Sequence, residues 1–322
     1  MSDEHQDARP EKRAPSEWVV APGKMLFTGA YAVLEGAPAI VIAVDRLARA
    51  HVHRPAEKPT AEVTEALGDK APFCDASALQ LDGKKLGLGS SAAVLVASLG
   101  AEAARQGKSL DDPDLRSRIF ARARDAHATV QQGGSGFDLA ASTYGGILRY
   151  TLHAGKSWVT SLDLPIALHW RAYFSGTSAR TSELRAQVDA FRGRDRDAYD
   201  RVMGKLGSAS EVAAKQLLDG SANGFVDAAR KFAEALEELG EESDAPIVPL
   251  PFRRLAVAAA AQGAAFFPSG AGGGDIGVYL GTTPPSDELE ARATQLGFHD
   301  LHLRLDLAGL RSEAPDATTT KG

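Results

Sequence analysis

The stretch Gly87-Leu88-Gly89-Ser90-Ser91-Ala92-Ala93 opens an apolar run at residues 94–99. Hydroxyl side chains followed by small residues are typical of a helix start, so we expect a helix over residues 91–106. The glycines before it allow a ligand to approach the backbone closely. Because a helix N-terminus offers unpaired N–H groups and the positive end of its dipole, the stretch predicts a phosphate-binding loop. The alternative is a glycine-rich turn that only caps a core helix, and the spacing is not that of a Walker loop.

Two further stretches carry similar glycine patterns. One is Ala21-Pro22-Gly23-Lys24-Met25-Leu26-Phe27-Thr28-Gly29-Ala30-Tyr31, and the other is Pro268-Ser269-Gly270-Ala271-Gly272-Gly273-Gly274-Asp275. Together and in this order, the three stretches resemble the signature motifs of the GHMP kinases. That family includes galactokinases, homoserine kinases, mevalonate kinases and phosphomevalonate kinases. The resemblance covers about residues 18–310.

The length and the element pattern predict two domains. A chain of 322 residues is long for one domain, and its alternating strands and helices favour an α+β architecture. The resemblance implies an N-terminal domain like domain 2 of ribosomal protein S5 and a ferredoxin-like C-terminal domain, with the site between them. We expect a disordered tail at 1–17, the ATP-binding domain at 18–164, the C-terminal domain at 165–311 and a tail at 312–322.

Composition narrows the classes of function. The net charge of -6 argues against a nucleic-acid surface as the main partner. A single cysteine, Cys74, excludes an intramolecular disulfide and suits a reducing compartment. No apolar run reaches the length of a membrane span, and the charged first residues lack the apolar core of a signal peptide. We therefore expect a cytoplasmic protein that binds neither nucleic acid nor membrane, and the sequence leaves open a monomer or a homodimer.

A second glycine-rich loop, residues 131–136, leads into Asp138. An aspartate between a loop and a helix is commonly an N-cap, which is the alternative interpretation here. The segment reads Asp-x-Ala-Ala-Ser-x-Tyr-Gly-Gly from Asp138 to Gly146, and it is similar to the catalytic-aspartate segment of the family, most of all in its phosphomevalonate kinases. The resemblance implies that Lys24 and Asp138 are the catalytic pair.

The same resemblance implies the remaining site residues. ATP is expected at Gly87, Leu88, Gly89, Ser90, Ser91 and Ala92, with Ser91 also a ligand of Mg²⁺. The acceptor is expected at Lys85, Ser135, Arg149, Ser178, Arg180, Gly270, Ala271, Gly272 and Gly273. The basic residues among them would offset a phosphorylated acceptor such as phosphomevalonate, in a chain that is acidic overall.

Two departures from the mevalonate kinase pattern concern the acceptor and the metal. Where mevalonate kinases have Gly-Glu-His, this chain has Gly29-Ala30-Tyr31, and no glutamate lies between Asp112 and Asp138. We therefore expect Mg²⁺ to rely on phosphates and water more than in those relatives. The resemblance favours a kinase that uses ATP to phosphorylate phosphomevalonate. The alternatives to this prediction are a mevalonate kinase or another small-molecule kinase of the family, and a non-catalytic relative that senses a nucleotide or metabolite. The presence of Lys24, Ser91 and Asp138 argues against the non-catalytic alternative.

Elsewhere the pattern predicts further elements. Residues 32–34 and 39–44 read as strands, residues 54–81 as an irregular or hairpin excursion, and residues 151–165 as a polar segment between the domains. A hydroxyl-rich loop at 175–182 is predicted to cap a helix that ends near Phe191, either as an anion site or as a plain cap. The last predicted strand is residues 300–305.

Overall fold

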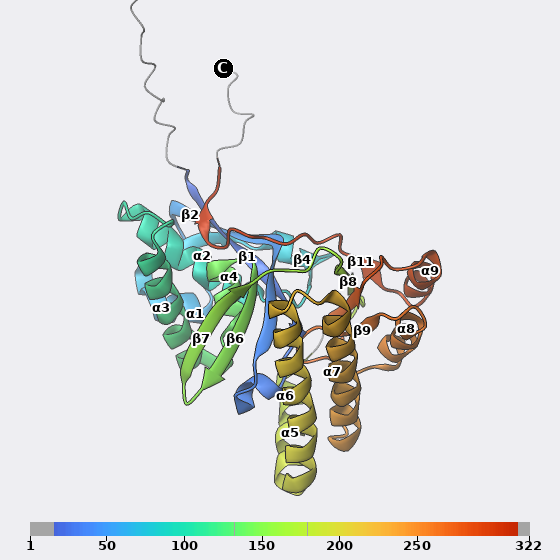
Figure 1. Cartoon of the computed structure of the whole chain (residues 1–322). Helices are drawn as coiled ribbons and strands as arrows, with labels where there is room; N and C mark the ends of the chain where they lie inside the picture. The colour runs from blue at the N-terminus through green and yellow to red at the C-terminus, as the bar shows by residue number, and fades with distance from the viewer. Residues whose placement is uncertain (1–15, 132, 179, 315–322) are drawn as a thin grey trace, which may run out of the picture.

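The computed structural model describes residues 16–131, 133–178 and 180–314, and the first part of this chain forms an antiparallel sheet (Figure 1). The strand order is β12-β1-β2-β6-β7, and β3 also pairs with β2. The strands are β1 (Trp18–Thr28), β2 (Ala39–Pro55), β3 (Pro72–Asp75), β6 (Ile147–His153), β7 (Lys156–Leu162) and β12 (Arg311–Ser312).

The helices beside this sheet are α1 (Ala61–Leu67), α2 (Ser90–Arg105), α3 (Pro113–Gln131) and α4 (Phe137–Tyr144). Helix α2 packs on β1 and β2. The side chains of α2 are mostly small and apolar around the whole helix, and every residue from Ala92 to Ala103 is buried. A helix without a polar face belongs in a core, which explains its central place. The small hairpin of β4 (Gln80–Leu81) and β5 (Lys84–Lys85) precedes the glycine loop.

The second sheet has the order β11-β8-β10-β9, with β8 (His169–Phe174), β9 (Ala265–Pro268), β10 (Ile276–Gly281) and β11 (His299–Asp300). Its helices are α5 (Thr181–Arg194), α6 (Arg196–Leu218), α7 (Ala222–Glu242), α8 (Leu250–Ala260) and α9 (Asp287–Gln295). Phe252, Phe266 and Phe298 pack against one another in its core, Phe298 in T-shaped contacts with the other two rings and Phe252 tilted against Phe266. The ring of Phe27 on β1 meets Trp170 and Phe225, so the two sheets share an apolar contact.

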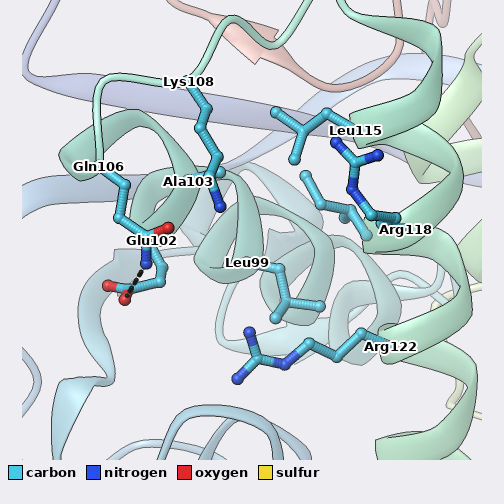
Figure 2. A pocket seen from close by; sticks show the side chains of 9 residues that line it. Leu99, Glu102, Ala103, Gln106, Lys108, Leu115, Arg118 and Arg122 are labelled. Atoms are coloured by element: carbon cyan, nitrogen blue, oxygen red, sulfur yellow. Dashed lines mark hydrogen bonds between the residues drawn. The ribbon is translucent and has the colours of Figure 1, made fainter.

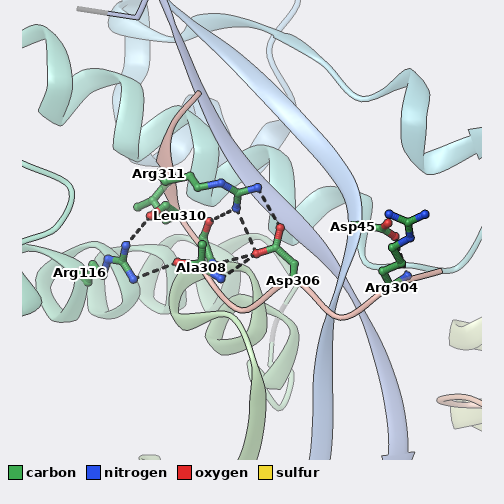
Figure 3. Close-up of polar contacts among 8 residues, drawn as sticks. Asp45, Arg116, Arg304, Asp306, Ala308, Leu310 and Arg311 are labelled. Carbon is green, nitrogen blue, oxygen red and sulfur yellow. Dashed lines mark hydrogen bonds and ion pairs between the residues drawn. The ribbon is translucent and has the colours of Figure 1, made fainter. Parts of the chain in front are cut away.

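The last described segment, residues 304–314, returns to the first sheet (Figure 3). Asp45 and Arg304 exchange hydrogen bonds: Asp45 N donates to the Arg304 carbonyl at 3.0 Å, and Arg304 N donates to Asp45 Oδ1 at 2.9 Å. The buried Asp306 carboxylate pairs with Arg311 at 3.0 Å, and the Arg116 guanidinium donates to two backbone carbonyls of the same segment. The predicted C-terminal domain range therefore ends in a segment that belongs to the sheet of the N-terminal one.

The predicted tails, 1–17 and 312–322, fall mostly outside the described residues. The described ends are not loose, because Ser312 pairs with Val19 in β12 and Glu313 N donates to the Trp18 carbonyl at 2.9 Å. The division at residue 165 stays a prediction.

The strand prediction for residues 32–34 is wrong. These residues form the 3₁₀ helix η1 (Ala32–Glu35). Its ends explain the difference: Tyr31 has φ 61 and Gly36 has φ 93, and both values turn the chain out of an extended path. An apolar triplet alone does not separate a strand from a helical turn.

Three other predictions need correction. Residues 54–81 contain the regular helix α1, which Thr60 caps by accepting from Val63 N at 3.4 Å, as well as β3. The polar segment 151–165 is no linker, since β6 and β7 form a hairpin across it. The strand expected at 300–305 shrinks to β11 and an isolated bridge from Leu305 to Val44.

Candidate active site

At Gly89 the glycine loop lies beside Lys24 of the first glycine stretch and beside Asp138. Gly89 precedes α2 with φ 75, in the left-handed region that glycine adopts without strain. A Cβ at this position would lie 3.0 Å from Cγ of Lys24 and 3.6 Å from Cβ of Asp138. The helix N-terminus therefore lies beside both residues of the predicted catalytic pair.

Lys24 is held in β1 and is buried. Its backbone N donates to the Leu88 carbonyl at 2.8 Å, and its ammonium Nζ donates to the Gly87 carbonyl at 2.9 Å. Burial lowers the pKa of Lys24 below its ordinary value, and the charges of Asp138 and Asp275 oppose that shift. Two carboxylates thus act on one buried ammonium beside the glycine loop.

Asp138 stands in the first turn of α4, where its Oδ1 accepts from Leu139 N at 2.9 Å. The helix starts after Gly136, whose φ is 77. The Tyr150 hydroxyl donates to the carbonyl of Ser135 in the preceding loop, and Ser142 Oγ donates to the Pro22 carbonyl of β1 at 2.7 Å. These bonds tie the helix that carries Asp138 to the strand that carries Lys24.

The third glycine motif docks on β1 from the second sheet. Ser269 Oγ accepts from Leu26 N at 2.8 Å and donates to Leu26 O at 3.0 Å. The Tyr31 hydroxyl donates to the Ala271 carbonyl at 2.7 Å, and Gly272 has φ 82 and leaves no space for a Cβ, which would lie 2.2 Å from Ile247 O. The residue that replaces the mevalonate kinase histidine thus anchors this motif.

Two charged residues at the site have no role in the sequence analysis. Asp275 lies against Gly87, since a Cβ there would be 2.6 Å from Cβ of Asp275. Arg185 on α5 acts electrostatically on Tyr31. Burial raises the pKa of Tyr31 above its ordinary value, and the Arg185 charge opposes part of that rise in the pKa. The position of Asp275 directly after three glycines was a usable signal, whereas nothing local distinguishes Arg185.

Part of the predicted acceptor set comes together in the second half of the chain. Ser178, Arg180 and Gly273 line one groove of about 540 Å³ beside the start of α5. The Arg180 guanidinium is exposed and pairs with Glu183 of its own helix at 2.9 Å, an arrangement that solvent weakens. The pKa of Arg180 is raised by this hydrogen bond to Glu183.

Two predicted basic residues have other surroundings. Lys85 is exposed in the hairpin before the glycine loop, where its neighbour Lys84 donates from Nζ to the Gly176 carbonyl at 2.9 Å. Arg149 pairs with Glu211 of α6 at 3.3 Å. Since neighbouring residues of a strand point to opposite faces, Arg149 leaves the face from which Tyr150 reaches the Ser135 carbonyl. The structure does not bring Arg149 to Lys24 and Asp138.

Hydroxyl and carboxylate oxygens that could bind a metal lie near Gly89. Ser90 and Ser91 begin α2 next to Gly89, and Asp138 faces that glycine. Within the described ranges, no group of three or more His, Cys, Asp or Glu residues could hold a metal alone. Hydroxyls and carboxylates beside a phosphate-binding loop suit Mg²⁺, which keeps waters and takes few protein ligands. Glu62, a buried glutamate of α1, is a carboxylate with another partner: it accepts from Gln131 Nε2 of α3 at 2.7 Å.

A separate cavity of about 190 Å³ lies between α2 and α3 (Figure 2). Leu99, Leu115 and Ile119 line it together with three cationic side chains, and Gln106 donates to the Glu102 carboxylate at 2.7 Å. The lining residues come from the C-terminal half of α2, the turn after it and α3, away from Ser90 at the start of α2, so this cavity is not part of the site described above.

Comparisons with known proteins agree with this geometry. Residues 80–146 match the family described as GHMP kinases N terminal domain. A phosphomevalonate kinase of a Streptomyces species is 30% identical over 335 aligned residues, which cover 81% of this chain and 88% of the relative. The chain belongs to the GHMP kinase family, and that prediction is confirmed.

Two other relatives fit the same assignment. The mevalonate kinase of Methanothermobacter thermautotrophicus is 29% identical over 62% of this chain and 70% of its own length. The structure of Streptococcus pneumoniae phosphomevalonate kinase in complex with phosphomevalonate and AMPPNP is similar with a TM-score of 0.75. It is 19% identical, and the similarity covers 89% of this chain and 99% of that one. The α+β fold of the family is therefore confirmed. Among the described residues, no helix is both long and apolar enough to cross a membrane.

Proposed function

We propose that this protein transfers the γ-phosphoryl group of ATP to the phosphate of 5-phosphomevalonate and so forms 5-diphosphomevalonate. The observation that carries the proposal is the meeting of Lys24, Asp138 and the start of α2 around Gly89. Phosphoryl transfer needs positioning and neutralisation of charge more than covalent chemistry. A helix N-terminus and a buried ammonium supply both.

The nucleotide phosphates would lie on the N–H groups from Gly87 to Ala92, where the dipole of α2 favours negative charge. A cavity of about 420 Å³ between β3 and the second turn of α2 offers a place for the base, and Phe73 and Val94 line it. Ser91, with Ser90 and Asp138 beside it, would hold Mg²⁺ against the phosphates. The metal would neutralise charge that develops on the transferred group.

The acceptor determines the role of Asp138. A phosphate monoester has its second pKa at about 6 and is mostly a dianion at neutral pH, so it needs no base to become a nucleophile. A carboxylate beside this acceptor would repel it unless a cation intervenes. We therefore assign Asp138 to holding Lys24 and the geometry of the site, and Lys24 to the charge of the transferred phosphoryl group.

The acceptor phosphate would bind in the groove that Ser178, Arg180 and Gly273 line. The Gly270–Gly273 backbone, Ser135 and Lys85 are proposed to supply further contacts to the acceptor. Arg149 is a weaker candidate for acceptor binding, because it lies on the face of β6 opposite Tyr150 and pairs there with Glu211. The carboxylate-paired Arg180 would exchange Glu183 for the incoming phosphate, which is a stronger partner for a guanidinium.

Mevalonate is the rival acceptor, because the chain is also similar to a mevalonate kinase. Coupled ADP release separates the possibilities when phosphomevalonate, mevalonate, galactose and homoserine are offered as acceptors. Phosphomevalonate should give the highest kcat/KM. A higher value for mevalonate would reject the proposed acceptor, and no turnover with any acceptor would favour a non-catalytic role.

A further inference from the structure

Asp275 has an unusual backbone conformation at an unusual place. It connects the glycines of the third motif to β10 and has φ 53, in the left-handed region that few residues other than glycine adopt. Aspartate tolerates this region better than most residues, but it persists only where the surroundings determine it.

The Asp275 side chain and the Lys24 ammonium approach the same residue from two directions. A Cβ on Gly87 would lie 2.7 Å from the Asp275 carboxylate oxygen Oδ2, so the carboxylate packs on the Cα of Gly87. The carbonyl of Gly87 accepts from Lys24 Nζ at 2.9 Å. Gly87 thus lies between the anion of one sheet and the cation of the other.

The backbone of Asp275 holds a third segment. Its N–H donates to the Thr177 carbonyl at 2.9 Å, and its carbonyl accepts from Ser175 N at 2.8 Å. The residue between these two, Gly176, accepts from Lys84 Nζ at 2.9 Å. The loop at 175–177, which leads into the acceptor groove, is therefore fastened to the third motif and to the hairpin before the phosphate loop.

The Asp275 carboxylate acts electrostatically on Lys24. Burial disfavours the charged form of Lys24, and Asp275 joins Asp138 in favouring it. Because both carboxylates attract the same buried ammonium, they restrict its position, which a reacting phosphate requires.

We propose that Asp275 is a positioning residue, which holds the Lys24 ammonium at the Gly87 carbonyl and keeps the 175–177 loop against the phosphate loop. Its kinetic consequence rests on the proposed function. Because Asp275 acts through Lys24, its effect on turnover should vanish when Lys24 is removed.

A double-mutant cycle tests this coupling. The change Asp275→Asn keeps the shape and removes the charge. In the parent protein it should lower kcat for phosphomevalonate at least tenfold and change the KM for ATP less than twofold. In a Lys24→Met background the same change should lower the residual kcat less than twofold. The matched control is Asp82→Asn, which alters an exposed aspartate that also has a positive φ, 48. It should leave kcat unchanged.

Equal losses in both backgrounds, or no loss in the parent, would overturn the positioning role. The same four proteins are unfolded by urea to measure the coupling without turnover. Asp275→Asn should change the unfolding midpoint by different amounts with and without Lys24, and additive changes would contradict the proposal. If the parent does not turn over phosphomevalonate, the proposed function fails, while the unfolding cycle still decides the role of Asp275.

Discussion

The Lys24 ammonium donates a 2.9 Å hydrogen bond to the carbonyl of Gly87, which lies 63 positions further along the chain. A second bond joins the backbones of the same two segments, from Lys24 N to Leu88 O at 2.8 Å. The glycine loop at residues 87–89 therefore packs against β1, and this loop, which we propose binds the nucleotide, also holds the Lys24 ammonium. We therefore expect substitutions near this contact to alter nucleotide binding, turnover or stability, and each effect has its own measurement.

Nucleotide binding should depend on the small size of Gly89. Replacing it by Val would put a side chain within 3.0 Å of Lys24 Cγ and strain a backbone with φ 75. We expect ATP affinity to fall about tenfold or more, which corresponds to ~1.4 kcal/mol. Calorimetry measures it. Gly263→Val is the matched control, because Gly263 has φ 74 and nothing within 4 Å of its Cβ position. Unchanged ATP affinity in a folded Gly89→Val variant would reject the phosphate loop.

Acceptor binding should depend on Lys85 and Arg180. A charge-assisted hydrogen bond to a phosphate is stronger than a bond between neutral groups, although exposure to solvent weakens it. Changing either to Ala should raise the KM for phosphomevalonate about tenfold and the KM for ATP much less. Arg196→Ala is the control, because Arg196 is also an exposed arginine that pairs with a carboxylate of its own helix, Asp200, at 2.8 Å. A larger rise for ATP would move these residues to the nucleotide side.

The pH dependence of an Asp138→Asn variant should separate a positioning carboxylate from a general base. We expect kcat to fall about a hundredfold, the usual cost of a misplaced group, because Lys24 loses a partner. The rate should show no compensating rise at alkaline pH, since the acceptor phosphate is already ionised. A steep gain in kcat with hydroxide, absent in the parent protein, would instead indicate a base and an alcohol acceptor.

Lys24 should also leave a signature in stability. Its pKa is lowered in the folded state by burial, so between the native pKa and the ordinary value of 10.5 the unfolded chain binds more protons. The free energy of unfolding should therefore rise with pH in that window. Urea unfolding at pH 7 and pH 10 should show a parent protein that gains stability relative to Lys24→Met as pH rises. A difference that is flat or falls with pH would contradict the lowered pKa.

Local sequence preferences account for separate segments of the candidate site. Glycines that adopt a positive φ, hydroxyl residues at a helix start and the mostly small, apolar side chains of α2 are properties of a few consecutive residues. The start of α2 and the family could therefore be predicted from the sequence, whereas phosphate binding by the glycine loop and the role of Asp138 stay predictions. The helix prediction over residues 91–106 differs from the observed Ser90–Arg105 by one residue at each end.

Which of these segments come into contact depends on long-range packing. The contact of Asp275 with Gly87, the partner of Arg149 and the return of Arg311 to β1 each join residues far apart in the chain. Local pattern carries no information about such partners, because they follow from how whole sheets pack and which strand edges remain to be paired. The same reason explains residues 32–34, where two left-handed residues and packing against α6 override an apolar triplet.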